Sequence, residues 1–434
     1  MTPKSFAVVG SGVAGLTAAH VLAREHRVTL FEADSRLGGH ADTHRVMLPS
    51  GAELAVDTAF LVHNDRTYPT LQRLFAELGV TTRETDMSMS VRCDRTGLEY
   101  AGARGINGLF PTVATAARPR YLRMLGEIVA FHRAARRVLA GPVSDESIAG
   151  FVSREGFSDY FEENFLLPLI AAVWSCDSAT AADYPARSLF TFLDHHGMLS
   201  VFGSPTWRTV AGGSATYVNA IAGRIAASGE IRLSQPVRGI RETPNGVEVV
   251  AHRAGSATTE TFDAVVLAVH PHQALDLLEH SADRAQILGA MPYLAKSAVL
   301  HTDESMLPRA RRARASWNYR IPDDERGAES IVVTYDVTRL MRLPDVGERM
   351  LVTMGRTDLV DPALILDEMT YEHPVYTRES VAAQARLPEL NTDRIALAGA
   401  YHGWGFHEDG AASGARAAAR LGVPWPAPGF GRNP

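Results

Sequence analysis

Cysteine is scarce in this chain. Cys93 and Cys176 are the two cysteines among 434 residues, which excludes a disulfide framework. Neither a Cys-x-x-Cys pair nor a Cys/His spacing typical of metal sites occurs, so we predict no bound metal. This cysteine usage fits a reducing compartment, and we expect a cytoplasmic protein.

Long apolar runs are also lacking. No segment approaches the roughly 20 apolar residues that a membrane-spanning helix needs. The first apolar stretch, Phe6–Val9, is too short for the core of a signal peptide and runs directly into a glycine turn. We therefore expect neither a transmembrane segment nor a secretory leader.

A basic excess is absent as well. The chain has 43 Lys and Arg against 49 Asp and Glu, a formal net charge of −6, whereas a protein that coats nucleic acid is strongly basic. No nucleic-acid partner is expected. One local cluster, Arg309, Arg311, Arg312 and Arg314, is interpreted as solvated loop charge, with phosphate or partner binding as the alternative.

The N-terminal residues predict a dinucleotide-binding βαβ unit. An apolar strand, Ser5–Val9, leads into Gly10-Ser11-Gly12-Val13-Ala14-Gly15, a helix over 16–24 and a second strand, Val28–Phe31. We expect Gly10 to permit the tight turn, Gly12 to let the backbone approach a pyrophosphate, and Gly15 to let the helix pack on the strand. The free N–H groups at the helix N-terminus favour a diphosphate.

Glu32 ends this unit. It follows the glycines by about 20 residues and can accept hydrogen bonds from a ribose 2′-hydroxyl. An acidic side chain here disfavours NADP, because it would repel a 2′-phosphate. The glycine pattern alone is common in loops, but both strands, the helix and Glu32 together favour a dinucleotide site.

The next residues distinguish FAD from NAD. Glu32-Ala33-Asp34-Ser35-Arg36-Leu37-Gly38-Gly39-His40 resembles the ExxxRxGG extension of the two-domain flavoproteins, which include amine oxidases, protoporphyrinogen oxidase and phytoene desaturases. The resemblance implies FAD as the cofactor, with Arg36, Gly38 and Gly39 along its pyrophosphate and ribityl chain. It also implies FAD contacts from Ala33 and His40.

Further segments resemble flavin-contacting parts of the same superfamily. Residues 56–62 are expected to form a strand beneath the isoalloxazine, with Thr58 and Ala59 in contact with it. Val237 is expected to contact the adenine through its backbone, and Ala268 belongs to the strand 262–271 that resembles another FAD-contacting strand. A strand, glycine-rich turn and helix over 394–414 resemble the segment that closes over FAD, with contacts from Gly399, Ala400, Phe406 and His407. The N-terminus of that helix is expected to point toward the pyrimidine end of the flavin.

Several motifs resemble one bacterial family of predicted NAD/FAD-binding proteins within this superfamily, and this resemblance covers essentially the whole chain. The motifs are Leu37–His44, Asn64–Pro69, Val173–Ser175, Leu300–Asp303, Ser316–Tyr319 and Gly405–Gly410. The family is associated with fatty-acid modification, which hints at lipid-like substrates.

We therefore predict an α/β fold: a Rossmann-like FAD-binding domain of the GR2 flavoprotein type with an interleaved α+β substrate domain. A chain of 434 residues is long enough for two closely joined domains. Residues 1–62, 206–290 and 391–434 are assigned to the FAD-binding domain. Residues 63–205 and 291–390 are assigned to the substrate-binding domain.

The resemblance to amine oxidases also implies catalytic residues. In those enzymes a lysine often holds a water near flavin N5, and Lys296 occupies the matching strand, although a strand-end surface lysine is the alternative. Phe406 and Tyr376 are candidates for the aromatic rings that frame the substrate, with simple packing as the alternative for Phe406. The stretch Glu372–Tyr376 lacks the cysteine that tethers flavin in some monoamine oxidases, so no thioether link is expected.

Three functions stay open at this point. The first is oxidation, in which FAD takes hydride from a CH–NH or CH–CH bond of a small hydrophobic substrate, with oxygen or another electron acceptor. The second is an FAD-dependent lipid or isoprenoid desaturase or a redox-neutral isomerase. The third is a non-catalytic flavin-binding module.

Overall fold

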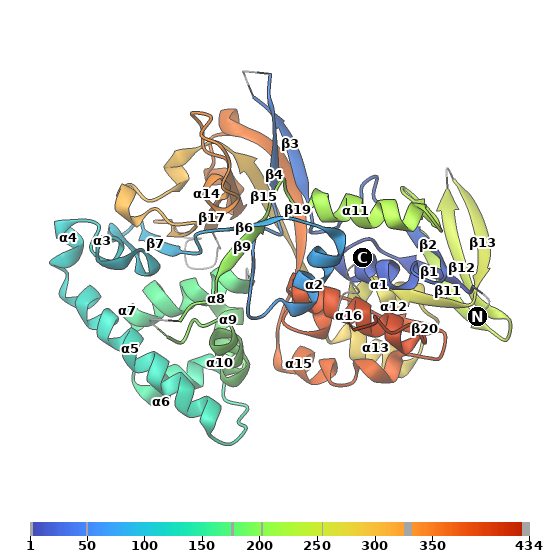
Figure 1. Ribbon diagram of the computed structural model, residues 1–434. Helices are drawn as coiled ribbons and strands as arrows, with labels where there is room; N and C mark the ends of the chain where they lie inside the picture. Colours follow the sequence, from blue (N-terminus) through green and yellow to red (C-terminus); the bar gives the residue numbers. More distant parts are fainter. Residues whose placement is uncertain are drawn as a thin grey trace.

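A parallel five-stranded sheet forms the centre of one lobe in the computed structural model, which describes residues 3–48, 51–174, 178–200, 203–253, 255–324 and 332–427 (Figure 1). Ser175 of the motif Val173–Ser175 and Cys176 lie outside these ranges. The strand order is β10 (Glu230–Arg232), β2 (Arg27–Phe31), β1 (Ser5–Val9), β14 (Ala264–Leu267) and β20 (Ile395–Leu397). All four pairings are parallel, as in the predicted Rossmann-like domain.

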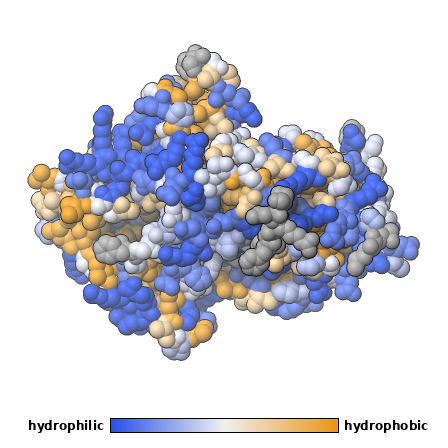
Figure 2. All heavy atoms as spheres, in the orientation of Figure 1, coloured by the Kyte–Doolittle hydropathy of each residue, from blue (hydrophilic) through white to orange (hydrophobic). Residues whose placement is uncertain are grey.

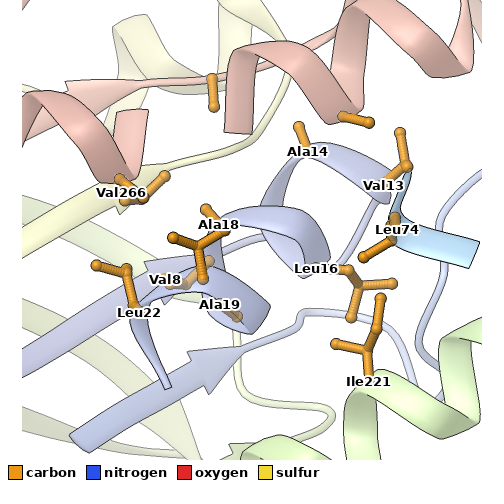
Figure 3. Close-up of a cluster of buried hydrophobic side chains, with 14 of the residues drawn as sticks. Val8, Val13, Ala14, Leu16, Ala18, Ala19, Leu22, Leu74, Ile221 and Val266 are labelled. Atoms are coloured by element: carbon orange, nitrogen blue, oxygen red, sulfur yellow. The ribbon is translucent and has the colours of Figure 1, made fainter. Parts of the chain in front are cut away.

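One face of this sheet is covered by helices. The helices are α1 (Val13–Leu22), α2 (Pro69–Leu78), α11 (Ala215–Ala226) and α16 (His407–Arg420). Figure 3 shows Leu16 of α1 between Leu74 of α2 and Ile221 of α11, all within one buried cluster. Because α1 lies between the sheet and the other helices, it is buried along its whole length.

The opposite face packs against a second, antiparallel layer. Its strands are β11 (Val237–Thr243), β12 (Gly246–Arg253) and β13 (Ser256–Phe262), and α12 (Pro271–Leu277), α13 (Ala282–Gly289) and α15 (Arg378–Gln384) lie beside them. Phe31 of β2 meets Phe262 of β13 edge to face, with ring centroids 6.0 Å apart. The parallel sheet is therefore buried on both faces.

The other lobe contains a seven-stranded mixed sheet. Its order is β19 (Ile365–Pro374), β15 (Tyr293–His301), β18 (Leu351–Gly355), β17 (Val332–Asp336), β16 (Trp317–Ile321), β7 (Met89–Cys93) and β8 (Leu98–Ala101). The pairing of β16 with β7 is parallel, and the other pairings are antiparallel. Strands β15 and β19 run toward the first lobe (Figure 1).

A helical region completes this lobe. It comprises α3 (Gly105–Leu109), α4 (Val113–Ala116), α5 (Pro119–Ala140), α6 (Ile148–Glu155), α7 (Asp159–Phe161), α8 (Leu167–Trp174), α9 (Ser178–Asp183) and α10 (Ala186–His195). Its core is rich in phenylalanine, and the rings of Phe131, Phe151, Phe161 and Phe190 are fully buried. Within the described ranges, no helix is both long and apolar enough to cross a membrane.

Short strands join the two lobes, and here one prediction is wrong. The strand expected over 56–62 is instead the end of β4 (Glu53–Asp57), which forms a hairpin with β3 (Thr43–Met47). The backbone N–H groups of Thr58 and Phe60 donate to the carbonyls of Asp42 and His40, so the chain turns there. The next strand is the short β5 (His63–Asn64), which pairs with β9 (Trp207–Val210), and β9 also pairs with β6 (Thr82–Glu84).

Candidate flavin site

The first glycine loop lies at the carboxyl end of β1 and leads into α1. Gly10 has φ +96°, and a Cβ atom there would lie 2.4 Å from the Ala268 carbonyl oxygen. A Cβ on Gly15 would lie 1.9 Å from the Gly10 carbonyl oxygen, so both positions require glycine for packing. Gly12 differs, because its Cβ would meet nothing within 4 Å.

The N-terminus of α1 faces this open space. Gly12 is the N-cap, and no side chain caps the helix. Ser11 is fully buried, and Val13 and Ala14 begin the helix with N–H groups that have no partner inside it. Uncapped N–H groups beside open space are the donor set that a diphosphate needs, so the loop fits the pyrophosphate of FAD.

Glu32 is anchored to the same loop. One oxygen of its carboxylate accepts from the Ser11 N–H at 2.9 Å and the Ser11 hydroxyl at 2.5 Å. The other oxygen accepts from the Asp34 N–H at 2.9 Å. These bonds fix the carboxylate at the end of β2 with Ala33 beside it, where it was predicted to meet a ribose.

The paired glycines lie directly against the first loop. Gly38 bridges to Gly12 and donates its N–H to the Ser11 carbonyl at 3.1 Å. A Cβ on Gly39 would lie 3.2 Å from the Gly12 Cα, and both paired glycines have positive φ. The side chain of Arg36, 40% exposed, donates to the Gly39 carbonyl at 3.0 Å and to Asp42 at 2.9 Å. Arg36 therefore holds this turn in place.

A buried polar network that we did not predict lies beside this turn. The Tyr371 hydroxyl on β19 donates to Asp42 at 2.8 Å and lies 2.6 Å from the Thr58 hydroxyl. Thr58 is buried and Ala59 half-buried. Burial raises the pKa of the Tyr371 phenol, which therefore stays a neutral donor.

Three histidine rings gather at the same edge. His40 lies 6.4 Å from His270 and 5.5 Å from His373 between ring centroids. Burial lowers the pKa of His373 to about 4 and that of His40 well below its ordinary value, so both rings are neutral at pH 7. His40 Nε2 and His373 Nδ1 are buried without a hydrogen-bond partner among the described residues. Such atoms call for a polar ligand, and a flavin would supply one.

Lys296 reaches this cluster from β15. It is half-buried opposite Tyr371 of β19, and its charge contributes to the lowered pKa of His373. Lys296 and Lys4 are the only two lysines in the sequence, and the other 41 basic residues are arginines. The position of Lys296 at flavin N5 and its alternative role as a surface lysine both stay predictions.

Phe406, another predicted catalytic residue, belongs to a separate group of aromatic side chains. Phe406 stacks on Phe192 of α10 with centroids 5.1 Å apart and planes at 16°. Trp404 meets the same Phe192 edge to face at 6.1 Å, and His196 lies 5.8 Å from Phe406. We call Phe192, His196, Trp404 and Phe406 the aromatic wall.

Tyr376 lies next to this wall. Its buried hydroxyl donates to the Gly403 carbonyl at 3.0 Å. A Cβ on Gly405 would lie 2.8 Å from the Tyr376 oxygen, so the glycine lets the two segments meet. Tyr376 and Phe406 thus lie at the aromatic wall, whereas Lys296 lies on β15 opposite Tyr371.

The start of α16 carries the predicted flavin contact His407. His407 stacks on Phe60, with ring centroids 3.7 Å apart, and its Nε2 lies 3.1 Å from the Tyr217 hydroxyl. Asp409 accepts from the Trp404 and Phe406 N–H groups at 3.1 and 2.9 Å. Burial raises the pKa of Asp409 to about 6, because its charged form is desolvated.

The remaining predicted contacts lie at the ends of other strands. Ala268 follows β14 and donates its N–H to the Val9 carbonyl at 2.8 Å. Gly399 follows β20 and donates to the Ser413 hydroxyl at 2.9 Å, with Ala400 next to it, and Val237 is buried at the start of β11. Because parallel strands end at one edge, the loops after β1, β2, β14 and β20 converge there.

One group of side chains has the composition of a metal site. Ligand atoms of His270, His272 and Glu372 lie within 4.8 Å of one another. His270 Nδ1 and Glu372 Oε2 are 2.7 Å apart, a hydrogen bond that accounts for this pair on its own. Our expectation of no bound metal stays a prediction.

Sequence reasoning missed Asp42, Tyr371, His270 and His373. Asp42 lies inside the motif Leu37–His44 and His270 inside the segment 262–271, each two residues after a predicted FAD contact, a signal that could have found them. Tyr371 and His373 lie on β19 opposite Lys296 and Leu294 of β15, and this pairing carries no local sequence pattern.

Comparison with known proteins identifies the class. The family model for flavin containing amine oxidoreductases matches residues 13–315. The chain belongs to this family, which confirms the predicted class of FAD-dependent oxidoreductase and its cofactor.

Two oxidases are similar to this chain over part of its length. The L-amino-acid oxidase of Bungarus fasciatus is 59% identical over 44 residues, which are 10% of this chain and 8% of that protein. The coproporphyrinogen III oxidase of Mycobacterium leprae (strain TN) is 26% identical over 329 residues, 69% of this chain and 67% of that protein. The match to the first of these is thus confined to less than a tenth of its length.

Solved structures confirm the predicted fold. Cyclohexylamine oxidase from Brevibacterium oxydans IH-35A has a TM-score of 0.65 at 16% identity, over 96% of this chain and 98% of that chain. Putrescine oxidase bound to putrescine has a TM-score of 0.66 at 16% identity, over 96% and 99%. At this identity the likeness concerns the fold.

Proposed function

We propose that this flavoprotein takes hydride from a CH–NH or CH–CH bond of a small, uncharged, hydrophobic substrate. The observation that carries the proposal is the aromatic wall, whose stacked pair joins α10 to the segment that precedes α16. Burial lowers the pKa of His196 to about 4, so this wall is neutral at pH 7. Aromatic faces that carry no charge suit an apolar chain or a deprotonated amine.

We assign separate roles to the cofactor and to the side chains of the site. Bound FAD supplies the acceptor for the hydride. The chain orients the substrate with the wall, excludes water with its aromatic rings, and provides one positive charge at Lys296. We include in this proposal the FAD contacts of the glycine loops, Glu32, Arg36 and His40, and the assignment of residues 1–62, 206–290 and 391–434 to FAD binding.

Two bond types stay within the proposal. Cyclohexylamine oxidase and putrescine oxidase carry amine substrates in their names, and coproporphyrinogen III oxidase carries coproporphyrinogen III in its name. Oxygen is a suitable electron acceptor in either case. The neutral wall suits both an amine carbon and a saturated carbon pair, so substrate trials must include each class.

The test begins with cofactor content. We expect the purified protein to be yellow and to release FAD, not FMN, on denaturation. Anaerobic mixing with cyclohexylamine, putrescine, coproporphyrinogen III, a saturated lipid and an unsaturated lipid then tests the chemistry, and loss of flavin absorbance marks hydride transfer. Product without loss of absorbance indicates a redox-neutral isomerase. Yellow protein that dithionite reduces but no substrate bleaches indicates a binding module.

Phe406→Ala tests the wall itself. We expect full FAD content and a KM for the bleaching substrate raised about tenfold, which corresponds to the loss of a ring contact of about 1.4 kcal/mol. Phe110→Ala, which removes a half-buried ring from the helical region, is the matched control. An equal effect of both variants would show that the wall does not contact the substrate.

A further inference from the structure

We propose that this chain has a second ligand site, an arginine pocket that binds a phosphate-bearing ligand. The pocket is lined by Glu304, Arg311, Arg314, Arg339 and Arg349 and has a volume of about 270 Å³. Arg311 and Arg314 belong to the basic cluster for which phosphate binding was the alternative interpretation. The structure adds two further arginines that are remote in sequence.

The pocket is built from separate elements of the second lobe. Glu304 begins a 3-10 helix (Glu304–Met306), Arg311 begins another (Arg311–Ala313), Arg339 lies on α14 (Val337–Leu340) and Arg349 precedes β18. In Figure 1, α14 and β17 lie in the lobe opposite α1 and α16. The arginine pocket is therefore distinct from the candidate flavin site.

Positive charge exceeds negative charge at this place. Arg314 pairs with Glu304, and Arg349 pairs with Asp336 at 2.8 Å and with Glu304 at 3.9 Å. Asp336 is buried, and its carboxylate also lies 3.6 Å from Arg339. Glu304 and Asp336 are thus each shared between two arginines.

The remaining cations make the excess clear. Arg339 lies 3.2 Å from Asp86, and Asp86 also pairs with Arg104 at 3.0 Å. Arg311 has no acidic partner within 4.0 Å among the described residues. Arg104, Arg314, Arg339 and Arg349 therefore share Asp86, Glu304 and Asp336, and with Arg311 the group carries two positive charges in excess. Burial, and next the neighbouring Arg104, lower the pKa of Arg339, as expected where positive charge lacks compensation.

The arginine side chains that line the pocket indicate which kind of ligand it binds. A guanidinium group presents a planar fork that binds phosphate oxygens through two parallel N–H bonds. The volume is below the roughly 300–1,000 Å³ of pockets for drug-sized ligands, so a phosphate with a few further atoms fits and a dinucleotide does not. The shared chemistry is a phosphate group, either on a small soluble compound or on an anionic lipid.

Calorimetry on the full-length holoprotein tests this site with inorganic pyrophosphate as the probe. We expect one site, whose affinity falls about tenfold in Arg311→Gln because a charged fork is removed without stranding a paired acid. Arg312→Gln, an exposed neighbour that does not line the pocket, is the matched control and should change affinity less than about twofold. FAD content and flavin bleaching by substrate should be unchanged in both variants.

A second arm distinguishes the source of the phosphate. Sedimentation with phosphatidylcholine vesicles that contain phosphatidic acid, compared with phosphatidylcholine alone, tests a lipid headgroup. Vesicle binding that Arg311→Gln abolishes and Arg312→Gln keeps supports the site with a lipid ligand. Absence of binding to both probes, or equal weakening by both variants, overturns the proposal. Neither result depends on substrate oxidation, so this test and that of the proposed function can fail separately.

Discussion

Gly12 is the residue at which backbone geometry most directly limits what the flavin site can hold. Its Cβ would project into space with no atom within 4 Å, in front of the uncapped N-terminus of α1. We expect Gly12→Val to fold normally and to lose FAD by about tenfold or more, because the side chain fills the predicted pyrophosphate space. Flavin absorbance per chain and the circular dichroism spectrum measure the two effects.

The control for this change is Gly126→Val on the exposed face of α5. It makes the same substitution where a Cβ also meets nothing within 4 Å. It should keep its FAD. If Gly12→Val retains flavin as fully as this control, the loop after β1 is not the diphosphate site.

Lys296 places a positive charge at the histidine cluster. We expect Lys296→Met to keep FAD bound and to slow flavin reoxidation by oxygen about tenfold, because a cation stabilises the negative charge that develops on reduced oxygen. Reduction by substrate should change less. Stopped-flow measurement separates the two half-reactions.

Lys4→Met is the matched control, because Lys4 is exposed and is the only other lysine. Steady oxygen consumption by the parent protein must be established first. Equal rates in both half-reactions for Lys296→Met and Lys4→Met would contradict an oxidase-like role, and slowing of reduction alone would assign Lys296 to substrate orientation.

At the scale of elements, local patterns predicted structure well where one motif spans the whole element. Strands β1 and β2 lie where the sequence placed them, and helix α1 forms between them but begins at Val13 and ends at Leu22, earlier than the predicted 16–24. The prediction of a strand over 56–62 was wrong. It relied on a run of apolar residues that is typical of strands, but β4 ends at Asp57. The turn is set instead by bonds from Thr58 and Phe60 to the loop before β3, which local sequence does not encode.

The helices α1 and α16 meet through glycine. A Cβ on Gly414 would lie 2.1 Å from the Ala14 carbonyl oxygen. We expect Gly414→Val to force α16 away from α1, to destabilise the fold by about 3 kcal/mol or more, and to lower FAD retention. Ala419→Val makes a β-branched substitution on the exposed side of the same helix and should change the melting temperature little. Equal melting temperatures for the Gly414→Val and Ala419→Val variants would show that α1 and α16 are not in close contact at Gly414.

At the scale of the whole molecule, the candidate site joins distant parts of the chain. Asp42 and Tyr371 are 329 residues apart, yet they share one hydrogen bond. The order of the seven-stranded sheet was not predicted, because β7 pairs in parallel with β16, some 228 residues away. Motifs identify the FAD half of such a protein, whereas the substrate half depends on long-range pairing that no single segment specifies.

Buried histidines dominate the pH dependence of the whole fold. Burial lowers the pKa of His63, His132, His196, His301, His373 and His402 to about 4, and that of His407 to about 3, from the ordinary 6.5. The unfolded chain therefore binds more protons between pH 6.5 and 4, and stability falls as the pH falls through this window. Asp57 and Asp409 act in the opposite direction, because burial raises the pKa of each to about 6 from 3.8.

The histidines of lowered pKa outnumber these two carboxyl groups, so unfolding near pH 5 should take up several protons. Each proton taken up on unfolding changes the free energy of unfolding by about 1.4 kcal/mol per pH unit. The combined change over one or two pH units is comparable to the total stability of a domain. The melting temperature should therefore drop steeply from pH 7 to about 5. FAD must be held in excess, since its binding also stabilises the folded state. His132→Leu, on α5 in the helical region, should reduce the slope by about one proton. A melting temperature that stays level across this range would mean that these histidines are protonated inside the folded protein.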